Sequence, residues 1–250
     1  MLLESLSTRT PSIRRSKRAN RATFLRVAVL GLPVMLAVSC GESPTSKVMP
    51  SSSCVVSRKP AFAYVLNGLN ADTVSMFTVN SCTGDLIPTT PATVTTGINP
   101  ERMVVDPLGR FVYVANLVSN AADQATISMY RINSSTGILT LTDPPTVPTE
   151  FFPQGIGIDP SGKFVYTANS DDNTVSMFTV DPSTGILAPT TPASVATGWS
   201  PLSVTVHPSG KFAYAANQDD DTVSMYSINA ATGVLTPPDS CNSTNRIFSF

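Results

Sequence analysis

Few side chains in this sequence could carry out chemistry. The single histidine, His207, stands in the stretch HPSGKFAYAANQDDDTVSMYSI at 207–228. Histidine is a common general base because its pKa lies near neutrality, so His207 is our one candidate for catalysis or ligand contact. No G-x-S-x-G motif and no evident serine or cysteine partner accompanies it, so the sequence does not support a catalytic triad.

The cysteines and the acidic loops give little sign of a metal site. No C-x-x-C spacing occurs, and one histidine cannot complete a usual zinc site, so we predict neither a metal nor a cofactor. The acidic stretches SDDN at 170–173 and QDDD at 218–221 lack the spacing of an EF-hand, so we interpret them as solvated loops rather than Ca²⁺ ligands. In an oxidising compartment we expect a Cys54–Cys82 disulfide, with Cys241 left over.

The N-terminus has the pattern of an export signal. Seven basic residues precede the apolar run VAVLGLPVMLAVS at 27–39, and only Glu4 opposes them. The run is shorter than the roughly 20 residues that a spanning helix needs. Ala37-Val38-Ser39-Cys40 resembles the lipobox of bacterial lipoproteins. We therefore predict a signal peptide at 1–39, acylation of Cys40 and a linker at 40–59, which would attach the protein to a membrane of the bacterial cell envelope through lipid.

The charge that remains after removal of the signal excludes one class of partner. Residues 1–39 hold seven of the 16 Lys/Arg and one of the 17 Asp/Glu, so the remainder has a net charge of −7. Nucleic-acid binding proteins are typically basic, and we therefore expect no nucleic acid as a partner.

The rest of the chain consists of four copies of one sequence repeat. Tyr-x-x-Asn occurs at 64–67, 113–116, 166–169 and 214–217, in steps of 49, 53 and 48 residues. Each copy continues through a polar loop to a TVSMF-like segment and then to Thr-Gly. Four short strands separated by turn residues fit into each unit. We place the units at about 60–109, 110–162, 163–210 and 211–238, followed by a divergent tail at 239–250.

The strands do not alternate between polar and apolar residues. Val74, Met76 and Phe77 are all apolar, for example, and so are their counterparts in the other units. Such strands suit sheets that are covered on both faces. Four-stranded sheets of this kind, repeated about every 50 residues, predict an all-β fold, a β-propeller. We expect one methionine per unit to line the contacts between neighbouring blades: Met76, Met129, Met177 and Met225.

The repeat offers a structural explanation for His207. It aligns with Asp106 and Asp159, and all three precede proline in a tight turn. An acceptor at this position binds a backbone N–H two residues further on, and a neutral imidazole nitrogen can do the same. We favour this structural role over catalysis.

Tyr-Val-Ala-Asn followed by Thr-Val-Ser-Met-Phe resembles the YVTN repeat of bacterial β-propellers. The longer pattern PSGKFVYTAN…DDNTVSMFTVDPSTGIL resembles the lactonase-type propellers, which include the propeller form of 6-phosphogluconolactonase. The resemblance implies a hydrolase that opens a lactone, and it matches His207 to a histidine of the family. Where the family has glutamate after Tyr-x-x-Asn, this chain has Gln218, which cannot act as a base.

The resemblance also implies seven blades, whereas four units are present. Either the sequence is part of a larger propeller, which we favour, or four blades close on themselves. In the second case a strand at 246–250 would supply the inner strand that the first unit lacks.

Two functions from different classes follow. The first is an exported, lipid-anchored hydrolase of a lactone, a carboxylic ester hydrolase by resemblance. The second is a non-catalytic scaffold of the cell envelope that binds a carbohydrate, another small molecule or a protein through loops such as 117–125. The hydrolase needs a histidine, a glutamate and an arginine that converge, and of these only the histidine is evident.

The predicted signal can be tested by intact mass spectrometry of the native protein extracted from host membranes. We expect a mass that fits residues 40–250 plus acyl chains. An unprocessed N-terminus would contradict the signal, and a mass larger by about three units would show that the native chain is longer.

Overall fold

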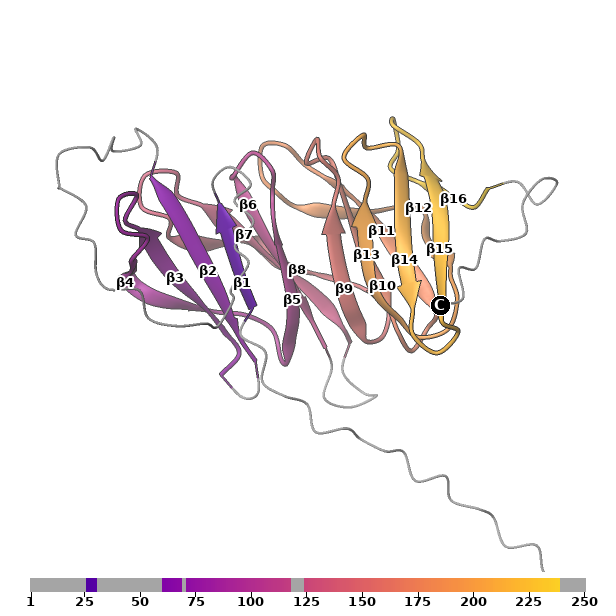
Figure 1. The fold of residues 1–250 in the computed structure, drawn as a ribbon, viewed down its shortest axis with the longest axis horizontal. Helices are drawn as coiled ribbons and strands as arrows, with labels where there is room; N and C mark the ends of the chain where they lie inside the picture. Colours follow the sequence, from indigo (N-terminus) through magenta and orange to yellow (C-terminus); the bar gives the residue numbers. More distant parts are fainter. Residues whose placement is uncertain (1–25, 31–59, 69–70, 118–123, 239–250) are drawn as a thin grey trace, which may run out of the picture.

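The computed structural model describes residues 26–30, 60–68, 71–117 and 124–238. Within these ranges every regular element is a strand, and no helix is present that could cross a membrane. The strands form four antiparallel sheets of four strands each, which lie side by side in chain order (Figure 1). The predicted all-β propeller of four-stranded blades is thereby confirmed for the fold class.

Each sheet is one blade, and within each blade the strands follow chain order. Blade 1 contains β1 (Arg26–Leu30), β2 (Ala61–Asn67), β3 (Thr73–Val79) and β4 (Leu86–Thr95). Blade 2 contains β5 (Pro100–Val105), β6 (Phe111–Asn116), β7 (Thr126–Ile132) and β8 (Leu139–Pro148). Blade 3 contains β9 (Pro153–Ile158), β10 (Phe164–Asn169), β11 (Thr174–Val180) and β12 (Leu187–Ala196). Blade 4 contains β13 (Pro201–Val206), β14 (Phe212–Asn217), β15 (Thr222–Ile228) and β16 (Leu235–Thr236).

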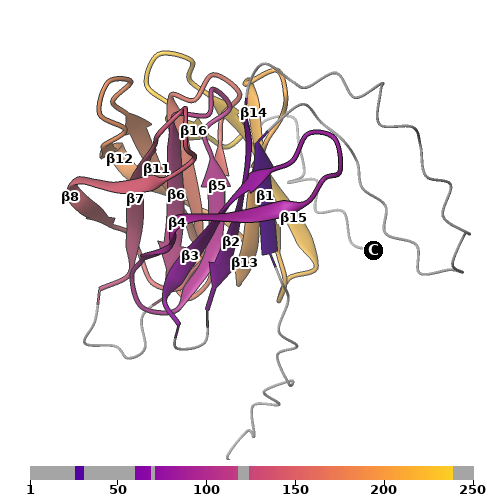
Figure 2. The same ribbon diagram turned by 90° about the vertical axis from the view of Figure 1, so that its left-hand side faces the viewer.

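The first strands of neighbouring blades, such as β9 and β13, lie against one another, whereas the fourth strands lie on the outside (Figures 1 and 2). The place of the inner strand in blade 1 is taken by β1, which pairs antiparallel with β2 from Arg26↔Leu66 to Leu30↔Phe62. These residues belong to the segment predicted as an export signal. The segment 246–250, which we considered for this role, lies outside the described residues.

The core consists of three layers, one between each pair of neighbouring blades. The central strands β6 and β10 are buried along their whole length because they are covered on both faces. Met76, Met129 and Met177 are fully buried between blades, as predicted. Met225 differs, because none of the described blades packs over its face of blade 4, and its side chain is 42% exposed.

One joint recurs at each blade contact, and we call it the Phe–Gly joint. A phenylalanine at the start of a second strand lies over the Thr-Gly turn of the next blade, which has a positive φ at its glycine. The nearby tyrosine hydroxyl donates to the carbonyl of that glycine at 2.8–3.0 Å, and the methionine Sδ accepts the N–H of the leucine two residues later at 3.1–3.2 Å. The three joints are Phe62/Tyr64/Met76 on Gly137/Leu139, Phe111/Tyr113/Met129 on Gly185/Leu187, and Phe164/Tyr166/Met177 on Gly233/Leu235.

Burial raises the pKa of the tyrosine hydroxyls in these joints, which keeps them protonated as donors. The glycines are required on two grounds. Their φ values of 73–78° disfavour a side chain, and a Cβ on any of them would lie 2.3 Å from a phenylalanine ring atom.

The joint predicts a difference between two glycines of similar backbone conformation. Gly185→Ala would place its Cβ 2.3 Å from Phe111 Cδ1, whereas Gly210→Ala would find its nearest atom, Pro160 Cδ, at 3.9 Å. Both glycines have positive φ, so both variants carry similar backbone strain. We expect Gly185→Ala to lower the free energy of unfolding by about 1–3 kcal/mol more than Gly210→Ala, measured by urea denaturation. Equal losses would contradict the joint.

Candidate functional site

His207 occupies the turn between β13 and β14, at the edge of blade 4. Its side chain is exposed, and its Nδ1 accepts the backbone N–H of Ser209 at 3.1 Å. The same nitrogen lies 2.8 Å from Ser209 Oγ. In this geometry the Nδ1 lone pair is directed at the backbone of the turn and not at a cavity. The geometry is that of the structural role we favoured.

The aligned aspartates fill the same position in a more buried setting. Asp159 accepts the backbone N–H groups of Ser161, Lys163 and Phe164 at 2.6–3.0 Å. Asp106 accepts from the guanidinium of Arg110, with Nε–Oδ2 at 2.7 Å. An acceptor side chain therefore organises this turn in all three blades, and His207 is one variant of it.

The structure does not bring His207 and Gln218 together. His207 precedes β14 and Gln218 follows it, so the two residues lie at opposite ends of a six-residue strand. A strand of this length spans about 20 Å. The pair taken from the family resemblance therefore cannot act on one substrate from within this blade.

A different carboxylate, Glu150, stands where the other blades have glycine. The loop that leads into the inner strand has the sequence TGINP at 96–100 and TGWSP at 197–201, but TEFFP at 149–153. A Cβ at Gly97 or Gly198 would lie within 2.6 Å of the amide of Asn116 or Asn217, so these positions exclude side chains. Blade 3 therefore has a local structure that admits glutamate. Our reading of the sequence missed Glu150, although the break in the repeat was its signal.

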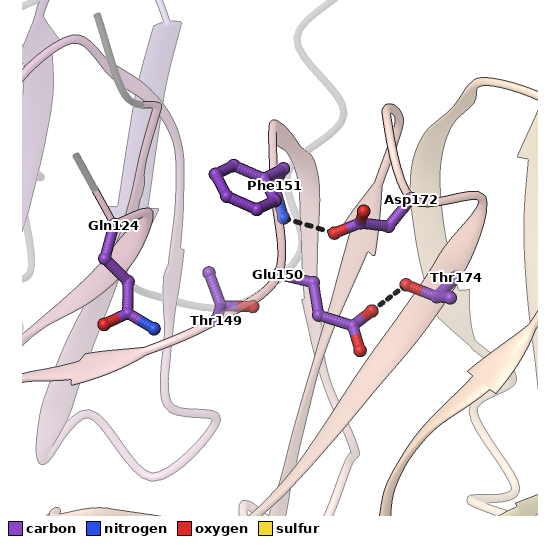
Figure 3. A pocket seen from close by; sticks show the side chains of 6 residues that line it. All are labelled: Gln124, Thr149, Glu150, Phe151, Asp172 and Thr174. Carbon is purple, nitrogen blue, oxygen red and sulfur yellow. Dashed lines mark hydrogen bonds between the residues drawn. The ribbon is translucent and has the colours of Figure 1, made fainter. Parts of the chain in front are cut away.

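The Glu150 carboxylate is held by hydrogen bonds from three side chains of blade 3. Its Oε1 accepts from Ser194 Oγ at 2.8 Å. Its Oε2 accepts from the Thr174 hydroxyl and from Asn169 Nδ2, the latter at 3.4 Å. Figure 3 shows the carboxylate pointing to Thr174, with Asp172 beside it on the loop that joins β10 to β11.

These groups line an open cavity of about 440 Å³ (Figure 3). A smaller hollow of about 200 Å³ adjoins it and shares Gln124, Thr149 and Glu150. Gln124 lies in the loop 117–125 that we considered for ligand binding, of which 118–123 lie outside the described residues. The lining residues of the larger cavity are Gln124, Thr149, Glu150, Phe151, Asp172 and Thr174.

Asp172 also fixes the loop that carries Glu150. Its Oδ2 accepts the backbone N–H of Phe151 at 2.7 Å. Asp220 does the same for Trp199 at 2.6 Å in blade 4. The result is an exposed aromatic side chain on each of these two loops, Phe151 beside the cavity and Trp199 on the next blade.

Charged side chains on the inner strand of blade 2 are a second feature that we did not predict. Glu101 and Arg102 are the second and third residues of β5, and Arg102 Nε donates to the carbonyl of Gln154 in β9 at 3.2 Å. The described ranges hold no group of three His, Cys, Asp or Glu residues that could bind a metal.

Cys82 takes part in a disulfide, but the other cysteines lie outside the described residues, so its pairing with Cys54 stays a prediction.

Comparison with known proteins identifies the family. The profile described as "Lactonase, 7-bladed beta-propeller" matches residues 35–152 and 141–245, which together cover most of the chain. This chain belongs to that family. The 6-phosphogluconolactonase of Pectobacterium carotovorum subsp. carotovorum is 30% identical over 113 residues, which cover 43% of this chain and 31% of the enzyme.

Two solved lactonase-family propellers show the same fold. One is a proposed 6-phosphogluconolactonase of Bacteroides fragilis, with 23% identity and a TM-score of 0.57, and the other is the periplasmic gluconolactonase of Pseudomonas aeruginosa, with 22% and 0.55. Each similarity covers 72% of this chain and 50% of the other. The chain thus spans about half the length of these propellers.

The hydrogen bonds of Glu150 predict a contribution to stability that depends on its charge. Glu150→Gln keeps the size of the side chain but turns charge-assisted hydrogen bonds into neutral ones and loses one acceptor. We expect the free energy of unfolding to fall by about 1–2 kcal/mol. Asp219→Asn is the matched control, because Asp219 is an exposed acid whose side chain makes no hydrogen bond to any other described residue. Equal stability of the two variants would contradict the network.

Proposed function

We propose that this lactonase-family propeller is an exported, lipid-anchored protein that binds a neutral, sugar-derived lactone in the Glu150 cavity and hydrolyses it. The observation that carries the proposal is the carboxylate of Glu150, fixed by three donors at a position where blades 2 and 4 have glycine. Among these three loops, only the loop of blade 3 replaces the glycine by a charged side chain, so this position is not needed for the shared structure of the repeat.

The cavity suits a small polyhydroxylated ring. Its volume of about 440 Å³ lies within the range typical of small-molecule sites. Glu150 and Asp172 offer acceptors, Gln124 offers both a donor and an acceptor, and the exposed Phe151 ring offers an apolar surface for the face of a sugar. These are the groups that hydroxyl-rich rings require.

The charge of the cavity favours a substrate without phosphate. Two of its lining residues are carboxylates, and none of them is Lys, Arg or His. A phosphate about 4 Å from a carboxylate is disfavoured by about 1 kcal/mol even in water, and by more where water is partly excluded. Of the two substrate types named for the similar proteins above, gluconolactone therefore fits better than its 6-phosphate.

Hydrolysis of such a ring requires water to attack the lactone carbonyl. The ring C–O bond then breaks, a proton passes to the leaving alkoxide, and a hydroxy acid results. Glu150 Oε1 accepts one described hydrogen bond and retains acceptor capacity, so we assign to it the orientation of the attacking water or of a substrate hydroxyl. The bonds to Thr174 and Asn169 hold the carboxylate in place.

Export and anchoring rest on the sequence pattern that ends at Cys40. A sugar lactone outside the cytoplasm is a reasonable neutral substrate for an anchored enzyme of the cell envelope. A binding scaffold without catalysis remains the second candidate. It is favoured by one observation, that the only histidine lies in a turn at the end of blade 4 opposite to Gln218.

The assay is the hydrolysis of glucono-1,5-lactone by the full chain, followed with a pH indicator against the spontaneous rate. We expect hydrolysis above background, a loss of about 10²-fold in Glu150→Gln, and no loss in Asp219→Asn or His207→Ala. The 6-phosphate of the same lactone should react more slowly.

Two outcomes would contradict the proposal. Binding of the lactone in calorimetry without turnover would replace the hydrolase by the scaffold. Turnover that Glu150→Gln leaves unchanged while His207→Ala abolishes it would move the site to the turn of blade 4.

A further inference from the structure

Two neighbouring blades carry an exposed aromatic side chain at the same position of the loop that leads into their inner strand. Phe151 precedes β9 of blade 3 and is 42% exposed, and Trp199 precedes β13 of blade 4 and is 67% exposed. The matching residue of blade 2 is Ile98, which is 51% exposed. Each of these loops connects the outer strand of one described blade to the inner strand of the next, so described blades flank all three alike. Exposure is therefore a property of this loop position.

The backbone of the Trp199 loop is fixed, although the side chain is largely exposed. The Trp199 N–H donates to Asp220 Oδ2 at 2.6 Å, as the Phe151 N–H donates to Asp172 Oδ2 at 2.7 Å. The carbonyl of Trp199 accepts the N–H of Asp219 at 3.3 Å. A ring that is carried on a fixed backbone loses little conformational freedom when a ligand binds, which favours binding. Blades 3 and 4 thus both present an aromatic ring beside a carboxylate.

The Trp199 loop is attached to the wall of the Glu150 cavity. Asp172 lines that cavity, and the next residue along the chain, Asn173, contacts the Trp199 loop. The Oδ1 atom of Asn173 accepts the backbone N–H of Ser200 at 2.8 Å. The short segment of Asp172 and Asn173 therefore holds both aromatic loops, one through each of its side chains.

The inner strands of blades 3 and 4 approach one another closely. Gly155 of β9 and Ser203 of β13 occupy matching positions, four residues after Phe151 and Trp199 respectively. A Cβ on Gly155 would lie 2.6 Å from the Cα of Ser203. Blade 2 has Arg102 at this position, so the glycine of blade 3 permits a backbone approach that a side chain would prevent. The two aromatic loops therefore lead into strands that are in direct contact.

An aromatic ring next to a carboxylate suits a pyranose sugar. The C–H face of the sugar can lie on the aromatic face, and its hydroxyl groups can donate to the carboxylate oxygens. Asp172 and Asp220 use Oδ2 for the loop backbone, while Oδ1 of each accepts no hydrogen bond from the described residues. Phe151 and Asp172 offer this pair of groups in the cavity (Figure 3), and Trp199 and Asp220 repeat it on the next blade.

We propose that Trp199 forms a second sugar subsite, and that the substrate is a lactone with a further sugar linked to one of its ring hydroxyls. This inference rests on the hydrolase proposed for the Glu150 cavity. The lactone ring lies in the cavity beside Phe151, and the linked sugar extends past Asp172 to the indole of Trp199. Only the lactone is opened, and the glycosidic bond stays intact. Two-electron oxidation of the hemiacetal at the reducing end of an oligosaccharide is the class of reaction that supplies such a lactone.

The first test compares glucono-1,5-lactone with cellobiono-1,5-lactone and maltobiono-1,5-lactone as substrates of the full chain. We expect kcat/KM for at least one disaccharide lactone to exceed that for gluconolactone about tenfold, through a lower KM, because the added contact is made to the bound ground state as well. Trp199→Ala should lower kcat/KM for that lactone about tenfold more than for gluconolactone, and Trp199→Phe should retain most of the preference. Ile98→Ala is the matched control, since Ile98 is exposed at the same loop position but does not line the cavity.

The second test measures binding without turnover. Trp199 is the only tryptophan of the chain, so its fluorescence reports ligand contact at this residue directly. Cellobiose and maltose contain no lactone, and we expect at least one of them to change the emission in a saturable way. Glucose at the same concentrations should leave the emission unchanged, because a single ring in the cavity does not reach the indole.

The two tests separate failure of the subsite from failure of the hydrolase. A saturable change in fluorescence without turnover of any lactone would overturn the hydrolase and leave the sugar subsite in place. Turnover of gluconolactone that depends on Glu150, with no preference for a disaccharide lactone and no change in fluorescence, would overturn the subsite. An equal loss on all three lactones in Trp199→Ala would overturn it as well, because such a loss reports damage to the fold and not a lost sugar contact.

Discussion

The contact on which the rest of the fold depends is the phenylalanine ring that lies on a left-handed glycine of the next blade. At this point four requirements meet within a few residues: no Cβ, a positive φ, a free glycine carbonyl for the tyrosine and a free leucine N–H for the methionine sulfur. These requirements depend on one another, because the phenylalanine ring lies in direct contact with the turn that carries the glycine. The sequence repeats about every 50 residues because each unit must supply both the phenylalanine ring and the glycine turn of this joint.

The joint also decides where chemistry can be placed. It uses the second and third strands of a blade and the turn between the third and fourth strands of the next, so the residues there recur from unit to unit. The opposite edge, with the loops that lead into the inner strands and those that follow Tyr-x-x-Asn, makes no such joint. It is at this edge that blade 3 replaces glycine by Glu150 and that Phe151 and Asp172 border a cavity. The separation leaves one edge to hold the blades together and the other free to differ.

The sequence was sufficient for the fold, because a fourfold repeat with uninterrupted apolar strands has few solutions other than a propeller. It also predicted the hydrogen bond that His207 Nδ1 accepts from the Ser209 N–H, since the aligned aspartates showed what the position needs. It failed for Met225, because a repeat describes the typical unit and does not show that no described blade packs on this face of blade 4. It failed for Glu150 because repeats draw attention to what is shared, whereas the candidate site lies in a departure from the pattern. The closeness of Glu150 to Ser194, 44 residues further along the chain, depends on the packing of loop and strand and not on any local signal.

The strand β1 determines whether the first blade of the processed protein has its inner strand. Its residues complete blade 1 by pairing with β2, and the same residues belong to the predicted signal. A molecule that keeps β1 has a four-stranded first blade. A molecule cleaved before Cys40 loses the β1 partners of the β2 backbone N–H and C=O groups, and a strand edge without partners is a template for pairing with another strand. The inner edge of blade 1 is therefore the part of the fold that processing would change, whereas the three Phe–Gly joints use no residue before Phe62 and would stay as they are.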